Sequence, residues 1–128
     1  MRRECIIYKS SDIYPRHVCI DVEDGLDIVS FLEDPKIRKK FDYIVNRILT
    51  QNFIYYEEYE QIKTFKGLSE IRLFPNGMNA RIYCKEVSTN NGNFYVVAAK
   101  LIPKKSSQKI NKEIGQFIKP LENYEYDI

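Results

Sequence analysis

The spacing of hydrophobic residues changes several times along the chain, and each change predicts a different element. Residues 4–8 and 17–22 are rich in β-branched and aromatic residues and predict two short strands. Leu26, Val29 and Leu32 then fit a short helical turn. The first thirty residues therefore predict a strand pair followed by a turn of helix.

The clearest helical signal begins at Asp34-Pro35. A capping aspartate followed by proline at the first helical position is typical of a helix start. We predict a helix over residues 35–52, whose apolar face consists of Ile37, Phe41, Ile44, Val45, Ile48 and Leu49. Its other face is basic, which is typical of a solvated surface.

Two further segments show helical spacing. Residues 56–65 predict a second, shorter helix that stops at Gly67. Residues 107–119 predict a last helix, whose apolar stripe is formed by Ile110, Ile114, Phe117, Ile118 and Leu121.

From Leu68 onwards, hydrophobic residues alternate with polar ones, which predicts half-buried strands. A tight two-residue turn at Asn76-Gly77 fixes the register of the first hairpin. It pairs Pro75 with Met78, Leu73 with Ala80, Arg72 with Arg81, Ile71 with Ile82, and Glu70 with Tyr83. A second turn at Asn91-Gly92 pairs Tyr83 with Lys100, Ile82 with Leu101, and Cys84 with Ala99. Both turns give the same apolar face, which continues across three strands.

The size and composition of the chain indicate one globular domain over residues 1–128, with 44% hydrophobic residues. The apolar runs are too short to span a membrane, and no signal-like stretch follows the N-terminus, so we expect a cytoplasmic protein. Twenty basic and eighteen acidic residues give a net charge of +2, which by itself says little about nucleic acid.

The chemistry-bearing residues exclude several classes of site. Cys5, Cys19 and Cys84 are widely spaced in apolar segments, which favours reduced core thiols over disulfides or a metal site. His17 is the only histidine, so a two-histidine ribonuclease mechanism is excluded. No glycine-rich phosphate loop is present. We therefore expect no metal and no cofactor.

The predicted pairing of Arg72 with Arg81 is unusual, because like charges directly opposite each other repel. An anion would relieve this repulsion, and phosphate suits the guanidinium fork. Tyr83, Lys100, Lys104 and Lys105 lie on or near the same face and could contribute a stacking ring and further cations. The alternative is that Glu70 and acids of the last helix or tail neutralise the arginines. The residues by themselves leave both interpretations open.

Three segments together resemble the RelE/HigB/ParE superfamily of bacterial toxins, and are most similar to its HigB-type branch, which includes phage-encoded relatives. They are SFLEDPKIRKKFDYIVNRIL (30–49), FKGLSEIRLFPNGMNARIY (65–83) and AAKLIPKKSSQKINKEIGQF (98–117). Their order and spacing match the first helix of the family, its two arginine-containing strands, and its Lys-Lys turn before a last helix. Residues 1–29 match less clearly.

The resemblance implies an α+β fold, in which two or three helices pack on one face of a twisted antiparallel sheet of about four to five strands. It also implies a toxin of a toxin–antitoxin pair that binds mRNA, often within the ribosome, and is neutralised by a cognate antitoxin. The implied reaction is metal-independent cleavage of mRNA, in which the 2′-hydroxyl attacks the neighbouring phosphorus.

The same resemblance assigns roles to individual residues. Arg81 resembles the phosphate-stabilising arginine of the family, Arg72 the arginine of the preceding strand, and Lys104 or Lys105 the basic residue after the last strand. Glu70 stands where relatives carry other residues and could act as the base or orient Arg72. The acid for the leaving group could be Lys100, Tyr124 or Tyr126.

Two other functions remain open at this stage. One is a ParE-like toxin that inhibits a topoisomerase without cutting RNA, and the other is an inactive protein that keeps only the fold and its binding role. An accessible cluster of Arg72, Arg81 and Lys100 would favour the nuclease, whereas burial beneath acids of the tail would favour the inactive protein.

Overall fold

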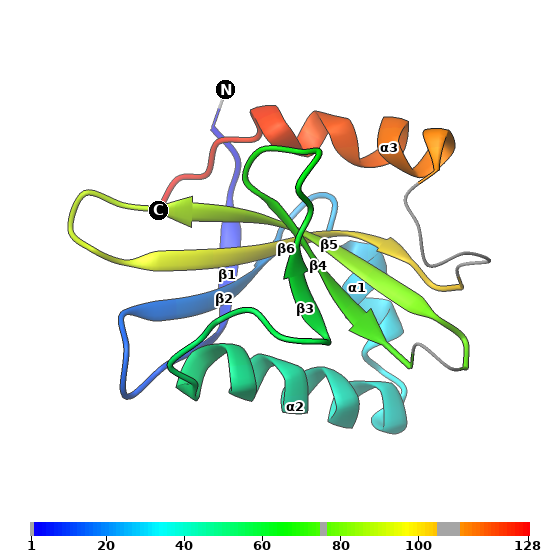
Figure 1. The fold of residues 1–128 in the computed structure, drawn as a ribbon, viewed down its shortest axis with the longest axis horizontal. Coiled ribbons are helices and arrows are strands. Elements are labelled where there is room, and N and C mark those ends of the chain that lie inside the picture. The colour runs from blue at the N-terminus through cyan, green and yellow to red at the C-terminus, as the bar shows by residue number, and fades with distance from the viewer. Residues whose placement is uncertain (1, 75–76, 105–110) are drawn as a thin grey trace.

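The computed structural model describes residues 2–74, 77–104 and 111–128 and shows a six-stranded mixed sheet between helices (Figure 1). The strands are β1 (Cys5–Ser10), β2 (Arg16–Asp21), β3 (Tyr59–Gln61), β4 (Leu68–Leu73), β5 (Ala80–Ser88) and β6 (Phe94–Ile102). The helices are α1 (Leu26–Phe31), α2 (Pro35–Thr50), α3 (Lys112–Ile118) and the 3-10 helix η1 (Lys119–Asn123).

The predicted α+β class is confirmed, with more strands than the four or five expected. The sheet order is β1-β2-β6-β5-β4-β3, and all neighbours are antiparallel except β2 and β6, which run parallel. Both N-terminal strands predicted by residues 4–8 and 17–22 are present, as β1 and β2, and they are the two strands at one edge of the sheet.

Helix α2 confirms the strongest helical prediction, although it ends two residues earlier. The Asp34 carboxylate accepts hydrogen bonds from the backbone N–H groups of Lys36 and Ile37, so the helix begins where the cap predicted. All six apolar residues of the predicted face are buried against the sheet. The short helical turn predicted by Leu26, Val29 and Leu32 is also present, as α1.

The helix predicted over residues 56–65 is wrong. Tyr59–Gln61 form strand β3, which pairs with β4 and places Tyr59 opposite Ile71. Backbone hydrogen bonds of 2.9 Å join Tyr56 and Tyr59 in both directions and close the turn before β3. The outer edge of β4 would otherwise expose unpaired backbone groups, and this pairing outweighs the weak helical spacing of the segment.

The register of the β4–β5 hairpin is confirmed from Leu73–Ala80 to Glu70–Tyr83. Its loop is longer than a two-residue turn, because the strands end at Leu73 and Ala80 and the Asn79 N–H donates to the Phe74 carbonyl. Phe74 and Asn79 both have positive φ angles, 51° and 54°. The predicted pairing of Pro75 with Met78 falls partly outside the described residues.

The register of the β5–β6 hairpin is confirmed for Tyr83–Lys100 and Ile82–Leu101, but not for Cys84, which pairs with Ala98 rather than Ala99. The Thr89 N–H donates to the Asn93 carbonyl at 2.9 Å, so the loop contains three residues and ends on Gly92, whose φ is 88°. This loop shifts the register by one residue, and a bulge between Tyr83 and Cys84 shifts it back.

Helices cover both faces of the sheet, not one face as the family resemblance implied. α1 and α2 pack on one face, together with Val18, Ile71 and Ile82, whereas α3 and η1 pack on the other face. The second face is apolar beside Leu68, Tyr83 and Ala99, which are all buried. That apolar patch requires its own cover, and Ile114, Ile118 and Leu121 of the predicted stripe supply it. Phe117 of the same stripe is 42% exposed, and residues 107–110 of the predicted helix, with Ile110, lie outside the described residues.

Candidate phosphate-binding site

Arg72 and Arg81 lie opposite each other in the β4–β5 pair, and both face the carboxylate of Glu70. Arg72 Nε donates a hydrogen bond of 2.8 Å to Glu70 Oε1, and Arg81 Nε lies 3.9 Å from the same oxygen. One carboxylate thus relieves part of the repulsion between two guanidinium groups. The side chains share the face that α3 and η1 cover.

Arg72 is held by a second carboxylate from the neighbouring strand. Its Nη2 donates to Glu60 Oε2 at 2.8 Å, and its Nη1 donates to the Glu57 carbonyl at 3.2 Å. Partial burial alone would lower the pKa of Arg72, but the hydrogen bond and charge of Glu70, aided by Glu60, outweigh it and raise the pKa. Arg72 therefore sits at the boundary between the buried cluster and solvent.

Arg81 is fully buried, with an exposed side-chain fraction of 0%. Burial lowers its pKa from the ordinary arginine value, while the charge of Glu70 acts in the opposite direction. The guanidinium stays protonated, since arginine does not lose its proton in proteins. Because it is buried, this guanidinium interacts with neighbouring charges more strongly than it would in water.

Glu70 and Tyr83 are cross-strand partners, two positions along the strands from the Arg72–Arg81 pair. Both are buried, and within the described part of the chain Glu70 Oε2 and Tyr83 Oη have no hydrogen-bond partner. Burial first, and then the charge of Glu70, raises the pKa of Tyr83 well above its ordinary value. Buried polar atoms without partners are uncommon and often mark functional positions.

Lys100 and Lys104 lie along the end of β6, beside this cluster. Lys100 pairs with Tyr83 across the strands, and its Nζ is 3.2 Å from Asp24 Oδ2 and 4.9 Å from the centre of the Phe117 ring. Lys104 forms no ion pair with any described residue and lines a pocket at the end of the strand. Lys105 lies outside the described residues.

Of the two tail candidates for the acid, Tyr126 lies away from this cluster, whereas Tyr124 lies near Lys100, because both contact Asp24 Oδ2. Tyr126 Oη donates to buried Asp21 at 2.6 Å, and its ring packs on Cys19 and Val97. Val97 is five residues along β6 from Ile102, the strand partner of Arg81, a separation of roughly 15 Å. Tyr124 Oη donates to Asp24 at 2.6 Å. The structure therefore does not bring Tyr126 to the arginine pair.

The acids of the tail do not neutralise the arginine pair in the contacts that the described residues show. Glu122 lies 3.6 Å from Lys119, and Asp127 lies 3.7 Å from Arg2. The neutralising groups are Glu70, as one interpretation predicted, and Glu60. Glu60 was missed because its segment was predicted as a helix. In the strand that forms there, Glu60 lies opposite Glu70 and diagonally from Arg72.

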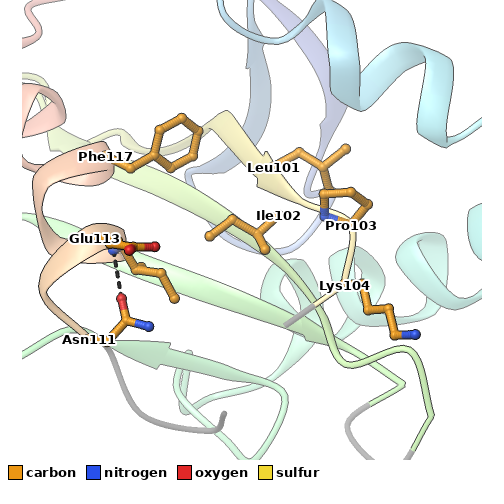
Figure 2. Close-up of a pocket in the computed structure, with 8 residues that line it drawn as sticks. Leu101, Ile102, Pro103, Lys104, Asn111, Glu113 and Phe117 are labelled. Carbon is orange, nitrogen blue, oxygen red and sulfur yellow. Dashed lines mark hydrogen bonds between the residues drawn. The ribbon is translucent and has the colours of Figure 1, made fainter. Parts of the chain in front are cut away.

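A pocket of about 380 Å³ opens between the end of β6 and α3 (Figure 2). Ile102, Pro103 and Lys104 line one side, and Glu113 and Phe117 line the other. Ile102, one of its lining residues, is the strand partner of Arg81.

Comparison with protein-family models, curated proteins and solved structures finds no match to this chain. The resemblance to the toxin superfamily therefore rests on the three sequence segments alone.

Two kinds of feature are absent from the described part of the chain. Within it, no helix is long and apolar enough to cross a membrane. No group of three or more histidine, cysteine or acidic side chains is arranged to hold a metal ion there. The three cysteines, Cys5, Cys19 and Cys84, are free thiols.

Proposed function

We propose that this chain is an mRNA-cleaving toxin of a toxin–antitoxin pair. The observation that carries the proposal is the arginine pair gathered on Glu70, with Lys100 and Lys104 at the end of the next strand. Two guanidinium groups on one face suit the pentacoordinate phosphate formed when a 2′-hydroxyl attacks the neighbouring phosphorus, because its added negative charge needs fixed cations.

The cluster also supplies groups for proton transfer. Glu70 would accept the proton of the attacking 2′-hydroxyl, since its Oε2 has no partner within the described residues. Tyr83 would donate a proton to the departing 5′-oxygen, because its hydroxyl lies in the same cluster, whereas Tyr126 does not. The products would be a 2′,3′-cyclic phosphate and a free 5′-hydroxyl.

Burial of Arg81 sets a condition on this reaction. RNA can reach its guanidinium only if the cover of that sheet face opens, and α3 and η1 pack on this face. The proposal therefore includes an open state of the protein, in which α3 and η1 no longer cover Arg81. In this state mRNA, which is often bound to the ribosome, would enter beside Lys104. A cognate antitoxin would prevent this entry, and the setting would be the cytoplasm.

A second candidate is a protein that keeps this fold and its binding role without cutting RNA. The observation that favours it is the complete burial of Arg81 together with the pairing of Arg72 to two carboxylates. In that case, the cluster would be a structural ion network.

Primer extension on transcripts after brief induction separates the two candidates. Wild-type chain should produce new 5′ ends and stop growth, whereas Arg81→Ala and Arg72→Ala should lose at least about 100-fold of the cleavage, because each removes a cation from the transition state. Arg38→Ala is the matched control, since Arg38 is exposed on α2. Circular dichroism would show that each variant is folded.

The outcomes of this experiment are distinct. No new 5′ ends with wild-type chain would contradict the nuclease, and growth arrest without cleavage would favour a topoisomerase-directed toxin. Wild-type cleavage by folded Arg81→Ala would show that the proposed site is wrong.

A further inference from the structure

The pocket between β6 and α3 has an aromatic side chain on one side and apolar side chains on the other, an arrangement that suits one flat ring. Phe117 is an aromatic residue with 42% of its surface exposed, and it stands on the α3 side. Leu101, Ile102 and Pro103 form an apolar surface on the other side (Figure 2). The volume of about 380 Å³ falls within the range of small-ligand sites.

The rim of this pocket carries hydrogen-bonding groups of both kinds. Asn111 Oδ1 accepts from the Ile114 N–H at 2.9 Å, which orients the amide and leaves its Nδ2 as a donor. Glu113 is exposed and forms no ion pair or hydrogen bond with any described residue, so its carboxylate is an available acceptor. The rim thus offers one donor and a carboxylate that accepts two hydrogen bonds at once.

We propose that this pocket binds a guanine base of the RNA substrate. Guanine presents two adjacent donors, N1–H and N2–H, to a carboxylate and an acceptor, O6, to an amide, and its ring would stack on Phe117. The other three bases lack that adjacent donor pair. The assignment rests on the proposed function for the identity of its ligand as RNA.

The position of the pocket connects base binding to cutting. Ile102 is paired with Arg81, and Lys104 lies in the pocket wall without an ion-pair partner among the described residues. A base held against Phe117 would direct its own phosphate toward Lys104 and the arginine cluster. The RNA would therefore be cut next to a guanosine.

Isothermal titration calorimetry of the full chain with the four nucleoside monophosphates tests this assignment without requiring cleavage. GMP should bind at least about ten-fold more tightly than UMP, because only guanine can donate two hydrogen bonds to the Glu113 carboxylate. Phe117→Leu should weaken GMP binding by about ten-fold through loss of stacking. Phe53→Leu is the matched control, since the Phe53 ring is 83% exposed and does not line this pocket.

Glu113→Gln separates recognition of the base from stacking. This variant should bring GMP and AMP affinities close together while leaving UMP affinity unchanged. Glu4→Gln, an exposed change just before β1, should alter neither. In the primer-extension experiment, the same variant should still cut but should lose its preference for guanosine.

Each result has a separate meaning. If GMP binding depends on Phe117 but the chain cuts no RNA, the guanine-binding pocket would be supported and the nuclease function would be contradicted. No binding of any nucleotide, or GMP binding unchanged in Phe117→Leu, would overturn the pocket even if RNA is cut. Equal affinity for all four nucleotides would overturn the guanine assignment.

Discussion

Glu70 accepts a hydrogen bond of 2.8 Å from Arg72, and the same oxygen faces the buried Arg81 at 3.9 Å. This arrangement makes Glu70 the counter-charge of two arginines, so its removal affects both stability and chemistry. We expect measurable effects from this contact and from the polar contacts of Asp34, Tyr126 and Asp21.

Glu70→Gln should lower the free energy of unfolding by about 3 kcal/mol, because it leaves the buried Arg81 without its counter-charge. Urea denaturation followed by circular dichroism measures the change. Glu60→Gln is the matched control: the Glu60 side chain is 48% exposed, and its ion pair should be worth only about 0.5 kcal/mol. Equal losses in the two variants would show that the Arg81 charge is balanced elsewhere.

Asp34→Ala should destabilise the protein by about 1 kcal/mol, because it removes the acceptor for the first N–H groups of α2. Asp34→Asn keeps an acceptor oxygen and should remain near the wild-type value. The comparison can be made from urea midpoints. A wild-type midpoint for Asp34→Ala would mean that water caps the helix equally well.

Tyr126→Phe should lower stability by about 2 kcal/mol without reducing RNA cleavage. The lost hydrogen bond is to the buried Asp21 carboxylate, and bonds to charged groups are the stronger ones. Cleavage should persist, since Tyr126 lies away from Arg81. Tyr83→Phe, by contrast, should reduce cleavage strongly. A Tyr126→Phe variant that is stable but inactive would restore Tyr126 as the acid.

The pH dependence of stability should report on Asp21. Burial alone would raise the pKa of Asp21, but hydrogen bonds from Arg3 and Tyr126 and from two backbone N–H groups outweigh it and lower the pKa. The folded carboxyl then binds a proton less readily than the unfolded one, whose ordinary pKa is 3.8. The stabilisation is therefore complete above this value and is lost as the pH falls through the folded pKa.

Asp21→Asn should flatten the fall in the free energy of unfolding below a pH of about 4, because the amide cannot titrate. Urea denaturation across an acidic pH series measures this slope. Asp127→Asn, an exposed change near the C-terminus, is the control. Slopes that are identical in wild type and Asp21→Asn would mean that other carboxyls dominate the acid transition.

Part of the site was predictable from sequence because it depends on local rules. The alternation of β4 and β5 and the position of the turn place Glu70, Arg72, Arg81 and Tyr83 on one face, and the structure has this register. The loop geometry was not predictable in the same way. Its strands close through Phe74 and Asn79, yet the longer loop leaves the pairing unchanged.

The sequence by itself determined α2 and the facing arginines, because caps, apolar spacing and strand alternation act between neighbours in the chain. Only the tertiary structure decided that residues 59–61 form a strand, that α3 covers the second sheet face, and that Arg81 is buried. These outcomes depend on segments far apart in the chain. An unpaired edge of β4 and a second apolar patch each require a partner, and no local pattern states which segment will provide it.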